Sequence, residues 1–237
     1  MSFNFRSKET EIMDDLLFDA SPVMEQTLKE LKLINKWLGG NQVTIDALEK
    51  IINKKEIRSK QPIKVADLGC GGGDMLVLLA NWFRNKSIKT QLTGIDANPN
   101  IISYARKNTK NYSEIIYKNI NIFSEEFTKE NYDIANCTLF CHHFSDDQLI
   151  QLLKSLKNQI STAVIINDLH RHWFAYHSIA LLTAYFSRSY MVKNDAKLSV
   201  LRSFRKPELE TIIKESGFST YEIRWKWAFR YQVILYP

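Results

Sequence analysis

A glycine-rich stretch carries the most specific chemical signal in the chain. Residues 67–74 read DLGCGGGD and follow a short apolar run. Glycine has no Cβ atom, so the backbone here can turn sharply and lie close against a ligand. A nicotinamide dinucleotide fingerprint would have a glycine where this chain has Asp74, whose charge would repel a pyrophosphate at the start of the following helix. Asp67, which precedes the glycines, favours instead a ligand that carries cationic groups.

A second candidate binding residue, Asp96, ends the next apolar run and is followed by Asn98 and Pro99. A carboxylate at the end of a strand can accept hydrogen bonds from both hydroxyl groups of a ribose. Asn98 is itself suited to cap the helix that Pro99 begins. Capping therefore does not require Asp96, and we expect its carboxylate to bind a ligand.

The five histidines lie close together in the sequence, between residues 142 and 177. Histidine is the side chain best suited to accept a proton near neutral pH. We predict His170, and after it His142, as candidate general bases, with a hydrogen-bonded structural role as the alternative. The spacing of the histidines and of the three cysteines matches no known metal site, so we expect no bound metal.

Side chains that follow these histidines are candidates for substrate binding. Arginine binds acidic groups through paired hydrogen bonds, and aromatic rings can line an apolar pocket. The apolar stretch 173–186 could equally belong to the core, and the arginines could pair at the surface. The residues that we expect to bind substrate are Arg171, His172, Tyr185 and Arg202.

Beyond residue 60, short apolar runs alternate with helical patterns, which is typical of an α/β protein. The runs that predict buried parallel strands are 63–68, 91–96, 115–120, 132–136 and 163–168. Helices are predicted at 75–83, after Asn98, and at 146–157, 173–188 and 207–216, and a final pair of strands at 219–225 and 228–235. The prediction is a doubly wound seven-stranded sheet, with five parallel strands and a C-terminal antiparallel hairpin. Ligands bind such a sheet beyond the carboxyl ends of its strands.

The first sixty residues have helical periodicity instead. Apolar residues recur at helical spacing from Ile12 and again from Met24. We expect Gly39 and Gly40 to end the second of these helices and Thr44 to begin another.

The glycine-rich stretch matches the motif acid-x-Gly-x-Gly-x-Gly, and the chain resembles the class I S-adenosylmethionine-dependent methyltransferases over residues 60–235. The resemblance implies S-adenosylmethionine as cofactor and a Rossmann-like domain over residues 61–237, with residues 1–60 as a helical lid. It implies that Asp67 lies near the methionine amino group and that Asp96 binds the ribose. The residues expected around the cofactor in these two motifs are Asp67, Gly69, Cys70, Gly71, Gly73, Asp96 and Ala97.

Two further stretches resemble later motifs of this family. Many members have an acid after the third strand that contacts the adenine; Asn121 stands there, and Ile122 is expected to pack on the ring. Residues 132–144 resemble the fourth strand and histidine-containing loop of small-molecule methyltransferases of the ubiquinone-biosynthesis type. Within it we expect Cys137 to contact the cofactor and His143 to be structural. The Asn/Asp-Pro-Pro-aromatic motif of enzymes that methylate base or glutamine amines is missing from this sequence.

The resemblance therefore implies an enzyme that methylates a small molecule on oxygen or carbon, with an aromatic, polyketide or lipid-like acceptor. The alternatives are an RNA or protein methyltransferase and a non-catalytic protein that binds the cofactor.

The overall composition is that of a globular domain, with 237 residues, a formal charge of +6 and 24% charged side chains. Its basic residues are spread among acids and asparagines, which favours a solvated surface over a nucleic-acid site. The chain does not begin with a secretory signal pattern, and its longest uncharged apolar stretch, 173–187, is too short to span a bilayer. We expect a cytoplasmic location; the oligomeric state stays open.

Overall fold

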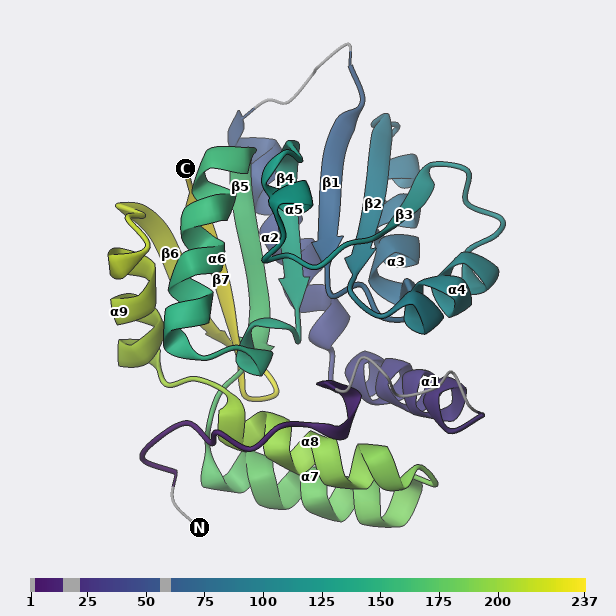
Figure 1. Cartoon of the computed structure of the whole chain (residues 1–237), viewed down its shortest axis with the longest axis vertical. Coiled ribbons are helices and arrows are strands. Elements are labelled where there is room, and N and C mark those ends of the chain that lie inside the picture. Colours follow the sequence, from purple (N-terminus) through teal and green to yellow (C-terminus); the bar gives the residue numbers. More distant parts are fainter. Residues whose placement is uncertain (1–2, 15–21, 56–60) are drawn as a thin grey trace.

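A seven-stranded sheet forms the middle layer of the protein, as seen in a computed structural model that describes residues 3–14, 22–55 and 61–237 (Figure 1). Among these residues the strand order is β3-β2-β1-β4-β5-β7-β6. Strands β1 to β5 pair in parallel, and β7 runs antiparallel to both β5 and β6. The strands are β1 Ile63–Leu68, β2 Thr90–Asp96, β3 Ile115–Asn119, β4 Tyr132–Thr138, β5 Ile160–Leu169, β6 Thr220–Lys226 and β7 Arg230–Tyr236. The predicted doubly wound sheet with a C-terminal hairpin is confirmed.

Helices cover both faces of the sheet because side chains alternate along each buried strand. On β1, Val65 packs in one apolar cluster with α2 and α3, whereas Ala66 packs in the other with α6 and α9. The helices on the first face are α2 Gly40–Lys55, α3 Asp74–Asn85 and α4 Pro99–Asn108, and those on the second are α5 Glu125–Thr128, α6 Asp146–Gln159 and α9 Lys206–Glu215.

A further group of helices lies beyond the carboxyl ends of the parallel strands (Figure 1). It consists of α1 Pro22–Trp37, α7 Trp173–Phe186 and α8 Tyr190–Arg202. Two short 3-10 turns face it: η1 Ile12–Asp14 in the N-terminal segment and η2 Cys141–His143 after β4. This helical layer closes the edge of the sheet at which ligands bind in doubly wound folds.

The N-terminal sixty residues divide between these two layers. Helix α2 packs Ile45, Leu48 and Ile51 into the same cluster as Val65 of β1, so it is a layer of the sheet domain. It begins at Gly40 and not at Thr44, because Gly39 alone takes up the left-handed turn between α1 and α2. Only α1 and the N-terminal segment lie over the strand ends (Figure 1). The expected helix from Ile12 begins with η1, and its continuation lies outside the described residues.

Helix α8 was not predicted from the sequence. Its polar residues Asp195 and Arg202 are buried together with Met191 and Leu198, so the helix lacks the apolar stripe by which a surface helix is predicted. Elsewhere the predicted boundaries are off by a few residues: β5 begins at Ile160, and α7 ends at Phe186, before Ser189 caps α8. In the described parts of the chain, every helix is too short or too polar to cross a bilayer.

Candidate active site

A cavity of about 840 Å³ separates the carboxyl ends of the strands from the helical layer. Its floor contains the glycine-rich turn after β1, the end of β2 and the residues after β4 and β5. Its other walls come from the segment Thr10–Asp14 and from helices α1, α7 and α8. The cavity therefore lies where doubly wound folds bind their ligands, and its size is within the range of small-molecule sites.

The glycine-rich turn brings bare backbone to the cavity floor. Gly69 has a φ of 66°, and a Cβ atom on it would lie 2.1 Å from the ring of Phe140. Gly71 also has a positive φ, of 49°, but the nearest atom to its Cβ position is 3.9 Å away, on Leu28. Any other residue at 69 would clash, and a side chain at 71 would be strained and would occupy space that the present backbone leaves to a ligand.

Asp67 is a buried acid at the end of β1 that lines this cavity. It accepts a 2.6 Å hydrogen bond from Asn136 Nδ2, on the neighbouring strand β4. Burial raises the pKa of the Asp67 carboxyl to about 7, although the hydrogen bond from Asn136 works in the opposite direction. A carboxylate with only a neutral partner is suited to a cationic ligand group.

Asp96, at the end of β2, lies directly beside the glycine turn. Its two oxygens accept hydrogen bonds from the backbone N–H groups of Gly71, at 3.3 Å, and Asn98, at 3.0 Å. Burial raises the pKa of its carboxyl above the usual range. Asn98 caps α4 through its side chain, as predicted, so Asp96 has no capping role there. Each carboxylate oxygen keeps a second lone pair with which it can accept a hydroxyl.

His142 and Asp168 form a buried pair on the opposite side of the cavity floor. The Nδ1 atom of His142 lies 2.7 Å from Oδ1 of Asp168, and the His142 backbone N–H donates to Oδ2 at 3.1 Å. Both side chains are buried, and His142 lines the cavity. Although burial opposes it, the adjacent imidazole holds the pKa of Asp168 below its usual range. The ionised carboxylate thus fixes the tautomer with Nδ1–H and leaves Nε2 as the basic atom.

The N-terminal segment places Glu11 against this histidine. Glu11 Oε1 lies 3.6 Å from His142 Nε2, too far for a hydrogen bond, and it is a buried oxygen without a hydrogen-bond partner in the described structure. Burial raises the pKa of Glu11 to about 7, although the charges of His143 and Arg202 and the hydroxyl of Ser199 lower it. When Glu11 is ionised, two hydrogen-bond acceptors face each other inside the cavity, and a group that donates to both would satisfy them.

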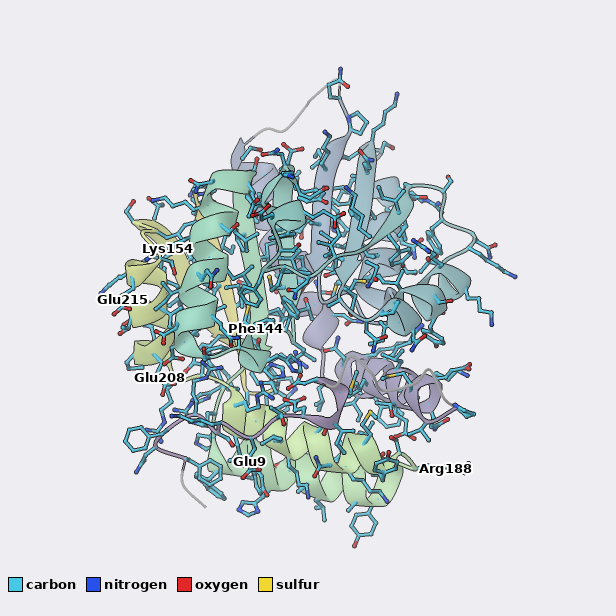
Figure 2. The ribbon with its side chains drawn as sticks, in the orientation of Figure 1. Glu9, Phe144, Lys154, Arg188, Glu208 and Glu215 are labelled. Carbon is cyan, nitrogen blue, oxygen red and sulfur yellow. The ribbon has the colours of Figure 1, made fainter. Side chains whose placement is uncertain are left out.

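Charged side chains hold the N-terminal segment in place over the cavity. The Asp195 carboxylate accepts hydrogen bonds from the backbone N–H groups of Ile12 and Met13. Arg202 Nη1 donates to Asp14 at 2.5 Å, and Arg6 donates to the carbonyl oxygen of Phe144, which Figure 2 labels close to the amino end of α6. No local pattern predicts these contacts, because each joins residues more than a hundred positions apart.

The family model described as "Methyltransferase domain" matches residues 65–163. This stretch runs from β1 through β4 into β5 and contains the glycine turn, Asp96 and His142. The chain therefore contains a methyltransferase domain that is similar to the class I S-adenosylmethionine-dependent methyltransferases. The methyl donor of this family is S-adenosylmethionine.

Relatives of this methyltransferase are distant. A protein of Sulfurimonas denitrificans named carboxy-S-adenosyl-L-methionine synthase is 26% identical over 172 residues, which are 68% of this chain and 72% of that protein. The solved plantazolicin methyltransferase BpumL, in complex with a triazolic substrate analogue and SAH, superposes with a TM-score of 0.67 at 16% identity over 92% of this chain and 97% of that one. A candidate O-methyltransferase of Nostoc punctiforme superposes with a TM-score of 0.64 at 18% identity. The superposition covers 96% of this chain and 64% of the Nostoc punctiforme protein. At these identities the structures show a shared fold.

The other predicted cofactor residues divide into two groups in the methyltransferase. Cys70, Ala97, Asn121 and Ile122 line the cavity. Asn121 uses its Oδ1 atom to accept the N–H of Phe123. Gly73 and Cys137 are not among the lining residues. Gly73 begins α3, with a Cβ position 2.2 Å from the Tyr117 hydroxyl, and Cys137 lies in the core behind β4, because its side chain points to the opposite face from that of Asn136.

Of the predicted catalytic residues, His142 has the stronger geometry. His170 also lines the cavity, but its Nδ1 atom accepts a hydrogen bond from Trp225 at 3.3 Å. Partial burial, together with the charges of His172 and nearby arginines, lowers the pKa of His170 to about 4. A base with so low a pKa accepts a proton weakly near neutral pH.

Most of the predicted substrate residues lie away from the cavity. Arg171 is buried in a network with Glu208 at the start of α9 (Figure 2) and with backbone carbonyls of residues 3, 4 and 203. His172 caps α7 by accepting the N–H of Phe174, and Tyr185 is 77% exposed. Arg202 lines the cavity, but all its nitrogen atoms are engaged by Asp14 and by the carbonyls of residues 142 and 143. The cavity face of α7 consists of Phe174, Ala175, Ser178, Ile179 and Leu182.

Glu11, His142 and His143 form the cluster in the described part of the chain that could hold a metal ion, with ligand atoms within 4.8 Å of one another. Ligands about 2.0–2.1 Å from a tetrahedral zinc lie closer together than this, at about 3.4 Å. In addition, Asp14 Oδ1 lies 2.6 Å from His143 Nδ1. The cluster therefore needs no ion to explain its hydrogen bonds, apart from the lone Glu11 oxygen.

Proposed function

We propose that this methyltransferase transfers the methyl group of S-adenosylmethionine to a small-molecule acceptor, on an oxygen or a carbon atom that must lose a proton. The observation that carries the proposal is the His142–Asp168 pair, with 2.7 Å between Nδ1 and Oδ1, in which His142 lines the same cavity as the glycine turn. A base held in one tautomer and aimed into a ligand cavity is what deprotonation of an acceptor requires.

The residues at the glycine turn fit the cofactor. Gly71 presents open backbone, Asp96 offers a carboxylate for two ribose hydroxyls, and Asp67 offers a negative charge for the methionine ammonium. Asn121 and Ile122 line the part of the cavity expected to hold the adenine. When bound, S-adenosylmethionine supplies an electrophilic methyl group on a sulfonium.

His142 acts on the acceptor in this proposal. Its Nε2 atom takes the acceptor's proton, and the negative charge of Asp168, which accepts from Nδ1–H, stabilises the imidazolium that results. Walls from α7, α8 and the N-terminal segment exclude water and hold donor and acceptor in line, which is the main requirement of a displacement reaction.

Glu11 indicates what the acceptor carries. Its unpartnered Oε1 faces His142 Nε2 at 3.6 Å, so an acceptor with a hydrogen-bond donor there would satisfy both atoms. The apolar face of α7 forms the opposite wall. A phenol or enol with an apolar body, aromatic, polyketide-like or lipid-like, combines these two features.

The charges around the cavity favour a small molecule over a nucleic acid. The lining contains six acids, Glu11, Asp14, Asp67, Asp74, Asp96 and Asp195. Two of its cations, Lys32 and Arg202, are already paired with Asp74 and Asp14. A polyanion would be repelled at such a surface. The buried base also distinguishes the enzyme from a protein that only binds the cofactor.

Synthesis of a carboxylated cofactor, the activity named for the Sulfurimonas denitrificans relative, is a weaker alternative here. A carboxylate on the transferred carbon would need a free cation close to His142. Arg202, the arginine in contact with the His142 carbonyl, is neutralised by Asp14 at 2.5 Å, and the cavity's other arginine, Arg230, lies beside Asn35 and Asn167. We therefore favour methyl transfer.

The direct test is turnover. The protein is incubated with S-adenosylmethionine and a panel of phenols, enolisable ketones and their methyl ethers, and release of S-adenosylhomocysteine is measured. We expect release with an unmethylated phenol or enol and none with its methyl ether. Binding of S-adenosylhomocysteine without turnover of any small molecule, but with methylation of RNA or protein, would contradict the proposal.

A further inference from the structure

Arg230, the first residue of β7, is a buried arginine in the wall of the cavity, 2% exposed. No motif in the sequence includes it. A guanidinium keeps its charge at all ordinary pH values, so burying it is unfavourable unless an anion compensates.

The partners of Arg230 are neutral. Nη2 donates to Asn35 Oδ1 at 2.9 Å, and Nη1 donates to Asn167 Oδ1 at the longer distance of 3.4 Å. Its Nε atom is buried and has no hydrogen-bond partner. No ion pair with a carboxylate joins it within residues 3–14, 22–55 and 61–237. Burial lowers the pKa of Arg230 to about 10, although the charge of Asp168, which forms no ion pair with it, works in the opposite direction.

A second positive group lies against the same guanidinium. The Cβ position of Gly40, the first residue of α2, is 2.6 Å from Arg230 Cζ. The amino end of a 16-residue helix carries partial positive charge, and α2 has no acid in its first turn to offset it. Asn41, the next residue, lines the cavity. Helix and arginine together form a positive wall in a cavity that is otherwise rich in acids.

A row of hydrogen bonds connects this wall to the buried acid on β1. Asn136 contacts both Asp67 and Thr138, at 2.6 and 3.2 Å. The row then runs from Thr138 to Thr44 at 3.0 Å, from Thr44 to Asn167 at 3.0 Å, and from Asn167 to Arg230 at 3.4 Å. Its interior members are neutral, and its two ends carry opposite charges that are not paired with each other. A ligand anion in the cavity would complement the Arg230 end of the row.

We infer that Arg230, with the amino end of α2, binds a ligand carboxylate, and that this carboxylate is that of the cofactor's methionine. The inference rests on the proposed function for the identity of the cofactor. An acceptor carboxylate is the other possible source of the same chemistry, and the experiment separates the two.

The test compares two ligands on two proteins by isothermal titration calorimetry. The ligands are S-adenosylhomocysteine and its decarboxylated analogue, 5′-deoxy-5′-(3-aminopropylthio)adenosine. On the wild-type protein, loss of the carboxylate should weaken binding roughly 10- to 100-fold, the range for a hydrogen bond between charged groups. On Arg230→Gln, the two ligands should bind within about threefold of each other. Arg224→Gln, at an exposed position on β6, is the matched control and should keep the wild-type ratio.

The ratio of the two affinities separates a binding role from a structural one, since a distorted cavity weakens both ligands alike. An unchanged ratio in Arg230→Gln would overturn the assignment to the cofactor. If S-adenosylhomocysteine binds Arg230→Gln normally while the KM of the acceptor rises, the carboxylate belongs to the acceptor. Arg230→Lys, which keeps the charge, should retain part of the preference and guards against a glutamine variant that fails to fold. If the wild-type protein does not bind S-adenosylhomocysteine, the proposed function fails first.

Discussion

Asp168 contacts His142 with both of its carboxylate oxygens: Oδ2 accepts the backbone N–H, and Oδ1 forms a hydrogen bond with the ring atom Nδ1. Strand β5 supplies the acid and η2, after β4, supplies the histidine, so two neighbouring parallel strands deliver the pair to the same edge of the sheet. This double contact fixes the ring orientation and tautomer together.

Replacing Asp168 by Asn should slow methyl transfer and leave cofactor binding intact. The amide cannot stabilise an imidazolium as a carboxylate does, so kcat should fall about 10²- to 10⁴-fold, the usual contribution of a general base. Turnover is measured with the acceptor found in the panel, and affinity with S-adenosylhomocysteine. Asp147→Asn, the same change in the exposed first turn of α6, is the control. Equal rates for both variants would show that His142 is not the base.

Asp96→Ala should remove most of the thermal stabilisation by S-adenosylhomocysteine. Ligand at about 100 times its dissociation constant stabilises a protein by roughly 2.7 kcal/mol, which is a rise of about 5–10 °C for a chain of this size. The variant loses the carboxylate expected to hold the ribose and should show little rise at the same concentration. A full shift in the variant would mean that the ribose lies elsewhere.

Cofactor affinity should depend on pH through Asp67. Its raised pKa, about 7 in the ligand-free protein, means that the carboxyl is protonated in acid and cannot pair with an ammonium. Affinity for S-adenosylhomocysteine should therefore level off above pH 8 and fall about tenfold for each pH unit below 7. Calorimetry from about pH 5.5 to 8.5 measures this. Asp67→Asn should bind more weakly and flatten the profile, and a sloping profile in that variant would assign the titration to another group.

Glu11→Gln should weaken binding of the acceptor and leave binding of the cofactor unchanged. The amide can accept one hydrogen bond but has no charge, so KM for a hydroxyl acceptor should rise about tenfold or more. Affinity for S-adenosylhomocysteine should not change. Glu9→Gln, two residues earlier and exposed, controls for the charge of the N-terminal segment. A parallel loss of cofactor affinity would place Glu11 at the cofactor instead.

Removal of metal ions should leave the methyltransferase active. The ligand atoms of Glu11, His142 and His143 spread over as much as 4.8 Å, and His142 and His143 are already held by Asp168 and Asp14. Dialysis against EDTA followed by an activity assay checks this expectation. Activity that is lost and then restored by one divalent ion would identify the cluster as a metal site.

Local sequence could predict the elements that depend on neighbours in the chain. The glycines at 69 and 71 have to be glycines because of their own backbone angles, and Asp96 and Asn98 follow directly from the end of β2. The errors came where a side chain's surroundings matter. Cys137 and Gly73 lie one residue away from cavity-lining neighbours, and Arg171 points to α9, which no local pattern reveals.

The sequence by itself determined the five parallel strands and the terminal hairpin, and the candidate cofactor residues in the turn after β1 and at the end of β2. Hydrophobic periodicity, glycines and helix caps act over a few residues, so local sequence is enough to predict them. Only the tertiary structure decided which residues form the rest of the cavity, where we expect the acceptor to bind. Glu11, His142, Asp168 and Arg230 come from four separate segments, and burial and packing bring them to one cavity. The pKa and hydrogen-bonding role of each side chain depend on the neighbours that it has in this cavity, and these neighbours are set by the folded chain.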